Sequence, residues 1–235
     1  MSTLFVVSTP IGNLEDITLR AVKTLWSVDT IACEDTRVTG QLLDLLRKRY
    51  PQLILTDRKP KLLSYRNTNE QNIVPVILDL LQKDADVALV TDAGTPLISD
   101  PGYRIVSECR KRDIPIIIIP GVSAFLTALT GSGMPANTFT FLGYLPEKPG
   151  VRQKLLEKMK QSSLLLSSTY ICYIAPHKLI QTLDAMMRLY GDIEIVIARE
   201  LTKLHEEYWY GTIIQAQEHF KEPKGEFVLL FTFNS

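Results

Sequence analysis

The sequence Thr91-Asp92-Ala93-Gly94-Thr95-Pro96-Leu97-Ile98-Ser99-Asp100-Pro101-Gly102 follows the apolar run 87–90 and precedes a helical pattern. It predicts a buried strand that ends in a stiff loop, because Gly94 permits a tight turn and the prolines restrict the backbone. Loops at the carboxyl ends of parallel strands bind the ligands of open α/β sheets. The loop contains neither G-x-G-x-x-G nor G-x-x-x-x-G-K-[ST], so a dinucleotide enzyme or an ATPase is not favoured.

Short apolar runs alternate with amphipathic stretches around this loop. Strands are expected at 4–8, 30–33, 62–65, 87–91 and 115–119. Helices are expected at 19–26, 39–49, 69–82, 103–112 and 123–131, with Thr18 as a cap for the first. The alternation predicts an α/β fold whose first domain has a mostly parallel sheet with helices on both faces.

The segment Gly131-Ser132-Gly133-Met134-Pro135 breaks this pattern and is the expected linker. It divides the chain into an N-terminal α/β domain, 1–133, and a C-terminal α/β domain, 134–235. In the second domain, strands are expected at 139–142, 164–166, 170–174, 193–198, 206–210 and 226–233, and helices at 152–161 and 178–189. The last two strands alternate in polarity, so this sheet should be mixed. A ligand cleft is expected between the domains.

Composition excludes several classes of protein. The 235 residues are 46% hydrophobic and carry 26 basic and 26 acidic side chains, so no bulk attraction to nucleic acid or membrane is implied. The three cysteines are far apart and the three histidines show no ligand spacing, which argues against a metal site. Free thiols fit a reducing cytosol, no secretory signal is apparent, and the longest aliphatic run, 116–119, is too short to span a bilayer.

Four loops follow predicted strands of the first domain, at 8–14, 34–37, 92–102 and 120–124. They should meet at one edge of the sheet. Three of them also have a simpler explanation. The first can be a plain strand-to-helix turn, the second an ion pair that caps a helix, and the fourth a helix cap at Ser123 without a ligand.

Together the loops resemble the tetrapyrrole methylase superfamily, and within it the methyltransferases of small-subunit ribosomal RNA. The matching segments occur in family order at 9–17, 34–37, 92–102, 143–146, 198–203 and 224–226. The resemblance implies S-adenosylmethionine as methyl donor and S-adenosylhomocysteine as product. It also implies a cytoplasmic homodimer that acts on 16S rRNA in the small ribosomal subunit. The reaction would be 2′-O-methylation of a cytidine in the decoding region.

Candidate site residues follow from loop position, charge and this resemblance. The candidates for cofactor binding are Pro10, Gly12, Asp92, Gly94, Thr95, Pro96, Ser123, Ala124, Leu201 and Gly225. A ribose hydroxyl is a poor nucleophile, so a base near it should help. Glu34 and Asp35 are candidates for that base or for positioning the acceptor, and Asp100 is a further candidate. Arg37 can orient a carboxylate or hold an RNA phosphate. The sequence leaves open which carboxylate is the base.

The charge pattern and the departures from the family pattern leave two other functions open. An RNA substrate needs a local positive track, for which the candidates are Arg37, Arg47, Lys48, Arg49, Arg58, Lys59 and Lys61. The family usually has Glu and Arg around the Pro-His pair, where this chain has Ile174 and Lys178. The alternatives are a tetrapyrrole C-methyltransferase on the same fold and a non-catalytic, cofactor-binding ribosome assembly protein.

Overall fold

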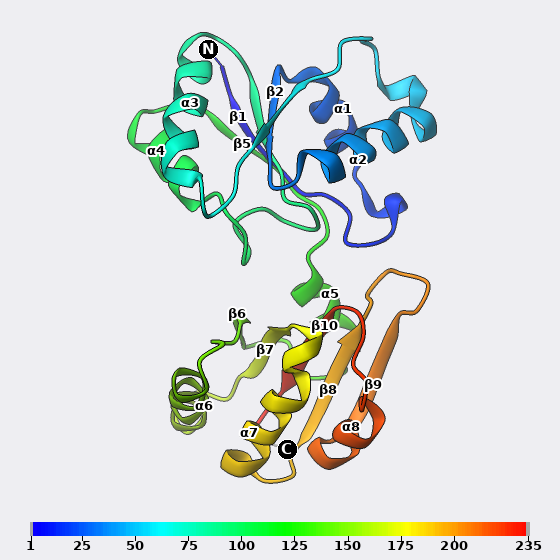
Figure 1. Ribbon diagram of the computed structural model, residues 1–235, viewed down its shortest axis with the longest axis vertical. Helices are drawn as coiled ribbons and strands as arrows, with labels where there is room; N and C mark the ends of the chain where they lie inside the picture. The colour runs from blue at the N-terminus through cyan, green and yellow to red at the C-terminus, as the bar shows by residue number, and fades with distance from the viewer. Residues whose placement is uncertain (1, 234–235) are drawn as a thin grey trace. The chain divides into compact units, whose positions relative to one another are not determined.

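The computed structural model describes residues 2–233, and the chain divides into two compact units between Ser123 and Ala124 (Figure 1). The first unit has a parallel sheet in the order β3-β2-β4-β1-β5. Its strands are β1 (Leu4–Val7), β2 (Thr30–Cys33), β3 (Lys61–Ser64), β4 (Val87–Leu89) and β5 (Ile116–Ile119). Its helices are α1 (Leu19–Ser27), α2 (Thr36–Arg49), α3 (Glu70–Gln82) and α4 (Tyr103–Lys111), with short 3-10 turns at Leu14–Asp16 and Pro51–Leu53.

Helices cover both faces of this sheet, as the alternating sequence predicted. On one face, α1 and α2 bury Leu25 and Leu43 against Ile31 of β2. On the other, α3 and α4 bury Ile77 and Ile105. A strand buried on both faces must be apolar at consecutive positions, which explains the continuous runs that mark β1, β2 and β4 in the sequence.

Side-chain caps fix where the first two helices begin. The Thr18 hydroxyl accepts a hydrogen bond from the main-chain N–H of Ala21, which confirms the expected cap of α1. Helix α2 begins at Thr36, earlier than the expected residue 39, because the Asp35 carboxylate accepts from the N–H of Arg37. Asp35 therefore has a structural role at the edge where the candidate site residues lie.

The second unit is built on a mixed sheet in the order β6-β7-β10-β8-β9. Strands β6 and β7 are parallel, whereas β10 runs antiparallel to β7 and β8, and β9 runs antiparallel to β8. The strands are β6 (Phe139–Tyr144), β7 (Thr169–Ile174), β8 (Glu194–Arg199), β9 (Glu207–Thr212) and β10 (Phe227–Phe231). The helices are α5 (Ala124–Gly131), α6 (Pro149–Ser163), α7 (Leu179–Tyr190) and α8 (Ile213–His219), and a 3-10 turn spans Pro176–Lys178. These two sheets confirm the expected fold class.

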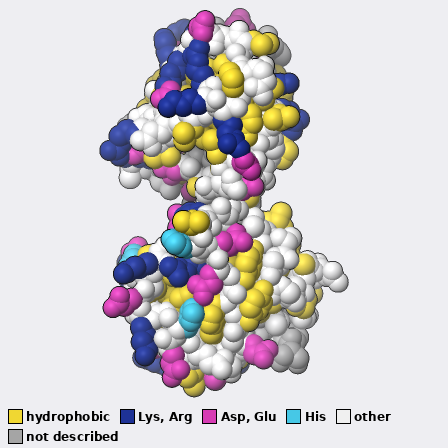
Figure 2. All heavy atoms as spheres, turned by 90° about the vertical axis from the view of Figure 1, so that its right-hand side faces the viewer, with side chains coloured by type: hydrophobic (Ala, Val, Ile, Leu, Met, Phe, Trp, Pro, Cys, Tyr) yellow, Lys and Arg dark blue, Asp and Glu magenta, His cyan; other side chains and the backbone are white. Residues whose placement is uncertain are grey.

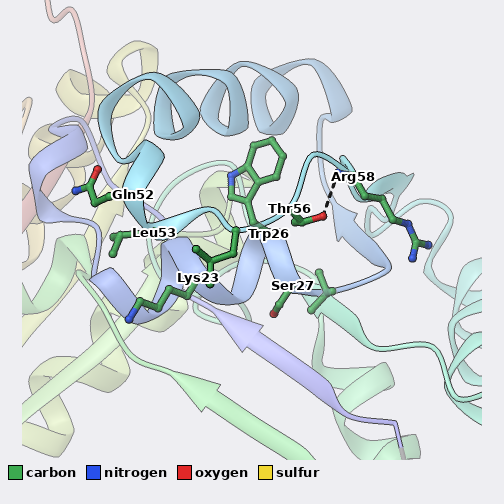
Figure 3. A pocket seen from close by; sticks show the side chains of 9 residues that line it. Lys23, Trp26, Ser27, Gln52, Leu53, Thr56 and Arg58 are labelled. Carbon is green, nitrogen blue, oxygen red and sulfur yellow. Dashed lines mark hydrogen bonds between the residues drawn. The ribbon is translucent and has the colours of Figure 1, made fainter.

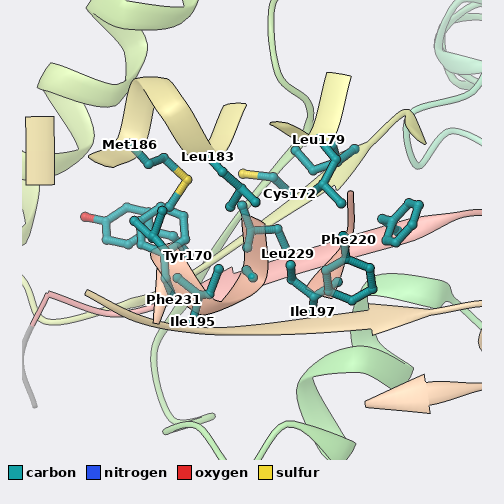
Figure 4. Packing of buried hydrophobic residues seen from close by; sticks show 14 of the residues in the cluster. Tyr170, Cys172, Leu179, Leu183, Met186, Ile195, Ile197, Phe220, Leu229 and Phe231 are labelled. Carbon is teal, nitrogen blue, oxygen red and sulfur yellow. The ribbon is translucent and has the colours of Figure 1, made fainter. Parts of the chain in front are cut away.

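One face of the second sheet carries the core of this unit (Figure 4). Side chains of α7, such as Leu183 and Met186, pack on Ile197, Leu229 and neighbouring strand residues. Tyr170 and Phe231 stack with their ring centroids 5.5 Å apart. The apolar positions that alternate along β8 and β10 supply this face.

Three sequence expectations differ from the structure of the second unit. Helix α5 contacts β7 and β10, so it belongs to the second unit and not to a domain that ends at residue 133. The expected strand 164–166 is an exposed turn after α6, with Leu165 90% exposed. Helix α8 was not expected, although Thr212 and Gln215 form a capping box that the sequence displays.

Two further expectations concern membrane-spanning segments and the cysteines. No helix among residues 2–233 is long and apolar enough to cross a membrane. The three cysteines are free and buried, and burial raises the pKa of Cys109 to about 11 and that of Cys172 to about 12. Thiols that stay protonated are poor nucleophiles, so these two residues act as packing groups.

The capping box gives a local test of the second unit. Thr212→Ala removes the cap and should destabilise α8 by about 0.5–2 kcal/mol. Hydrogen exchange of the α8 amides should accelerate accordingly, while exchange in α7 stays the same. Thr68→Ala, an exposed threonine of the first unit, serves as the matched control. Unchanged exchange in α8 of the Thr212 variant would show that the box contributes no stability.

Candidate active site at the carboxyl edge of the first sheet

The loops that follow β1, β4 and β5 are held together by hydrogen bonds. The N–H of Thr9 donates to the carbonyl of Gly94 at 2.8 Å, and the N–H of Gly94 donates back to Thr9 at 3.1 Å. The Thr95 hydroxyl donates to the carbonyl of Val122 at 3.1 Å and lies 3.0 Å from the Ser8 hydroxyl. The three loops therefore form one continuous backbone surface at this edge.

Gly94 makes this close approach possible. Its φ of +89° lies in the region that favours glycine, and a Cβ at this position would lie 3.3 Å from Cγ2 of Ile11. Two non-glycine residues of the same loop, Leu97 and Ser99, also have positive φ, of 72° and 68°. Such strained backbone is concentrated at ligand sites in proteins, and here it lies in the loop that was expected to bind a ligand.

Three carboxylates gather beside this surface. The Thr91 hydroxyl donates to Glu34, and its oxygen lies 2.7 Å from Oδ2 of Asp100. Oδ1 of Asp92 accepts from the main-chain N–H of Asp35 at 3.1 Å. Among residues 2–233, no Lys, Arg or His lies within ion-pair distance of Glu34, Asp92 or Asp100. The cluster is therefore negatively charged and has no cationic partner in the described chain.

This environment changes the acidity of Asp100. Burial raises the pKa of Asp100 to about 6, and the nearby carboxylates of Glu34 and Asp92 add to the rise, while the hydrogen bond with Thr91 opposes it. The Thr91 hydroxyl has one hydrogen and cannot donate to two carboxylates at once. A proton on Asp100 would satisfy the second contact, which agrees with the raised pKa.

Asp35 is in the opposite situation. Nε and Nη2 of Arg37 donate to its two carboxylate oxygens at 3.1 and 2.6 Å, and Nη2 of Arg66 lies 3.9 Å away. The hydrogen bonds from Arg37 hold the pKa of Asp35 well below its usual range. Nε of Arg66 also donates to the carbonyl of Glu34 at 2.7 Å. A carboxylate held in this way is a poor base, so Asp35 and the two arginines form a frame around Glu34.

The two candidates from the second unit lie together within that unit. Gly225, with φ +99°, precedes Glu226, whose N–H donates to Oε1 of Glu200 at 2.9 Å. Leu201 is buried next to Glu200, and a Cβ on Gly225 would lie 2.7 Å from Cγ of Glu200. The close contact between the two segments requires glycine at position 225.

The other expected site residues lie on the same loops of the first sheet or next to them. Pro10 is half-buried and Gly12 is exposed in the loop after β1, whereas Pro96 is buried in the loop after β4. Ser123 and Ala124 are half-buried at the start of α5. Sequence reasoning missed Thr91, Arg66 and Ser8. Thr91 had a visible signal, since it is the first hydroxyl after a buried strand, whereas the contacts of Arg66 depend on the fold.

Most basic side chains of the expected positive track form ion pairs with neighbouring acids on the surface of the first unit. Besides Arg37, four of its members form ion pairs: Arg47 with Asp57, Arg49 with Glu15, Arg58 with Asp29 and Lys59 with Asp44. Figure 2, which faces the α1–α2 side, shows acidic side chains among the basic ones. A pocket of about 530 Å³ lies beside α1, and Lys23 and Arg58 extend away from its buried Trp26 (Figure 3). Exposed pairs are weak, so these cations stay available to phosphates.

Comparisons with known proteins identify the family of this chain. Residues 3–217 match the tetrapyrrole (corrin/porphyrin) methylase family, and the chain belongs to that family. It is 44% identical over 232 residues to Ribosomal RNA small subunit methyltransferase I of Hydrogenobaculum, covering 97% of this chain and 95% of the relative. It is 42% identical to the protein of the same name from Thermotoga maritima, covering 99% of each chain.

Solved structures of the family share the fold. The methyltransferase CobJ superposes with a TM-score of 0.70 at 17% identity, covering 99% of this chain and 95% of that one. Uroporphyrin-III C-methyltransferase from Thermus thermophilus, complexed with S-adenosylhomocysteine, superposes with a TM-score of 0.63 at 14% identity, covering 98% and 97%. At these identities the likeness establishes the fold alone.

The raised pKa of Asp100 makes stability depend on pH. Above about pH 6 the folded protein keeps the Asp100 carboxylate charged in an unfavourable site, which lowers the free energy of unfolding. This loss of stability becomes smaller as the pH drops from about 6 toward 3.8, the ordinary pKa of an aspartate. Asp100→Asn should therefore be more stable than the unsubstituted protein by about 1–3 kcal/mol at about pH 8, with the difference shrinking toward about pH 4. Urea unfolding at both pH values measures this, with the exposed Asp113→Asn as control. An Asp100→Asn variant less stable than the unsubstituted protein at about pH 8 would contradict the raised pKa of Asp100.

Proposed function

We propose that the protein transfers a methyl group from S-adenosylmethionine to ribosomal RNA of the small subunit, at the 2′-hydroxyl of a cytidine in the decoding region. The observation that carries this proposal is identity of 42–44% along nearly the whole chain to proteins named Ribosomal RNA small subunit methyltransferase I. A tetrapyrrole substrate has in its favour the name of the matching family and a structural likeness at 14–17% identity, and neither is as specific as these relatives.

The chemistry of the candidate site fits a cationic nucleoside cofactor. S-adenosylmethionine carries a sulfonium and an ammonium group, and the cluster of Glu34, Asp92 and Asp100 has no cationic partner in the described part of the chain. The backbone surface formed by Thr9 and Gly94 lies at the carboxyl edge of a parallel sheet, where ligands of such sheets bind. The further proposed contacts of the cofactor are Pro10, Gly12, Thr95, Pro96, Ser123 and Ala124 of the same loops, and Leu201 and Gly225 of the second unit.

When bound, the cofactor supplies an electrophilic methyl group, and displacement at that group is in-line. The residues of this chain then have to align the acceptor oxygen and remove its proton. Asp100 is the best candidate for the base, because a pKa of about 6 lies near the operating pH. Glu34, held by Thr91 and by the frame of Asp35, Arg37 and Arg66, positions the acceptor. Asp100 therefore takes the place of Asp35 as the proposed base.

A homodimer in the cytoplasm completes the proposal. Strand β5 is an edge strand, and its isoleucines Ile117 and Ile118 are 43% and 53% exposed. An exposed apolar edge strand tends to be covered by another chain. Three unpaired cysteines suit a reducing compartment.

The experiment that tests this function uses labelled S-adenosylmethionine with 30S subunits and with stripped 16S rRNA, both from cells lacking the protein. The proposal expects label in a single 2′-O-methylcytidine, identified after nuclease digestion by mass spectrometry. Cofactor binding without transfer to either substrate would favour the non-catalytic assembly protein. Transfer to a tetrapyrrole precursor and not to RNA would favour the C-methyltransferase.

The assignment of the base has its own test. Asp100→Asn should lower kcat by about 10²–10⁴-fold and remove a limb of the pH–rate profile that rises through about pH 6. S-adenosylhomocysteine affinity should fall far less than kcat, because Glu34 and Asp92 keep the cluster negatively charged. Asp35→Asn keeps a capping side chain and should lower kcat by about tenfold or less. An Asp100→Asn enzyme with near-normal kcat and the same pH profile would contradict the role.

A further inference from the structure

A pocket of about 340 Å³ lies wholly within the second unit. It is lined by the segment between β6 and α6, the end of β7 and the turn before α7. The lining residues whose chemistry could bind a ligand are Tyr144, Arg152, Tyr173, Ile174, His177 and Lys178. None of them is among the candidate site residues described above, although the Tyr173 hydroxyl accepts from the N–H of Phe125, the residue after Ala124.

Arg152 is a buried cation without a counter-ion. The residue is 5% exposed, its Nε has no hydrogen-bond partner, and Nη1 makes only two long contacts, at 3.4 Å, with the carbonyls of Pro146 and Glu147. No carboxylate of residues 2–233 lies within ion-pair distance of it. A buried guanidinium is costly unless it is paired, so this position is poorly explained by the stability of the unit alone.

The other lining residues do not neutralise the charge of Arg152, and Lys178 adds a second positive charge. Lys178 is half-buried and His177 is exposed on the turn that precedes α7. Ile174 presents an apolar side chain. Glu147, the one acid among the lining residues, is exposed and forms no ion pair within residues 2–233. The pocket is therefore complementary to an anion.

An aromatic wall stands beside these cations. Tyr144 is 61% exposed and meets Tyr173 edge-on, with ring centroids 5.5 Å apart. Tyr173 in turn packs edge-on against Phe141 at 4.9 Å, which holds the wall in place. An exposed aromatic ring beside an arginine is the combination that binds unpaired nucleotides, with the base on the ring and the phosphate on the cation.

We propose that this pocket binds one nucleotide of a single-stranded RNA segment, with its phosphate held by Arg152 and Lys178 and its base stacked on Tyr144. The proposal deepens the proposed function, on which it rests, because it gives the RNA a contact point on the second unit. Bidentate binding of phosphate is a property of arginine that lysine cannot reproduce.

The test compares Arg152→Met, Lys178→Gln and the control Lys158→Gln, which removes an exposed lysine of α6. Affinity for a labelled single-stranded fragment of the decoding region is measured by fluorescence anisotropy at several salt concentrations. Arg152→Met should bind about tenfold more weakly, and the slope of log K against log salt should fall by about 1. Lys178→Gln should show the same change in slope, and the control should show none.

Thermal unfolding separates a binding role from a structural one. Removal of an unpaired buried charge should raise the Tm of Arg152→Met without ligand, and inorganic phosphate should raise the Tm of the unsubstituted protein but not of this variant. A lowered Tm with unchanged RNA affinity would overturn the proposal. If Arg152→Met does not fold, an unchanged slope for Lys178→Gln overturns it. Protection by phosphate that RNA does not displace would assign the pocket to a free phosphate compound and overturn the RNA contact.

The two proposals fail in distinguishable ways. Methyl transfer to RNA together with unchanged RNA affinity of Arg152→Met and Lys178→Gln would leave the function standing and reject the pocket. RNA binding that depends on Arg152 without any methyl transfer would keep the pocket and reject the function. S-adenosylhomocysteine affinity should be the same in all three variants, because none of these residues belongs to the cofactor site.

Discussion

The parallel pairing of β1 with β4 on one side and β5 on the other is the constraint on which the candidate site depends. In a parallel sheet the carboxyl ends of neighbouring strands lie at the same edge, so loops far apart in the chain meet there. The mutual hydrogen bonds of Thr9 and Gly94 fix two of these loops, and Thr95 links them to the third. A change that shifts β1 in register would separate all three.

The polar groups at this edge divide into a frame and a reactive cluster. Asp35 is neutralised by Arg37 and caps α2, and Arg66 ties the backbone of Glu34 to the same frame. Asp100 has no such cation, and it shares Thr91 with Glu34. Burial and like charge raise the pKa of Asp100, whereas the hydrogen bonds from Arg37 lower that of Asp35. Opposite shifts of this kind are how proteins assign different roles to similar groups.

Much of the fold could be predicted from local signals. Strands buried on both faces show as apolar runs, and a hydroxyl at Thr18 marks a helix start, so the sequence predicts nearly every element of the first unit. The errors arose where local and tertiary signals disagree. Leu164, Leu165 and Leu166 have the composition of a strand, yet they follow α6 as an exposed turn, and α8 is a short helix whose capping box was overlooked.

The chemistry of the site could be predicted less completely. Loop position indicated Glu34, Asp92 and Asp100, but the difference between Asp35 and Asp100 depends on which side chains pack around each, and no spacing rule shows that. Arg152 is a clearer case. In the sequence it belongs to a charged helix that would be expected on the surface, whereas in the fold it is buried and has no carboxylate partner among residues 2–233.

The central claim is that the loops of the first sheet hold the methyl donor. Hydrogen–deuterium exchange of the whole chain with and without S-adenosylhomocysteine tests it most directly, because it reports every segment at once. The account predicts protection at residues 8–14, 91–95 and 121–124, together with 200–202 and 224–226. Binding that protects other segments, such as the pocket beside Trp26, and leaves residues 91–95 unchanged would contradict it.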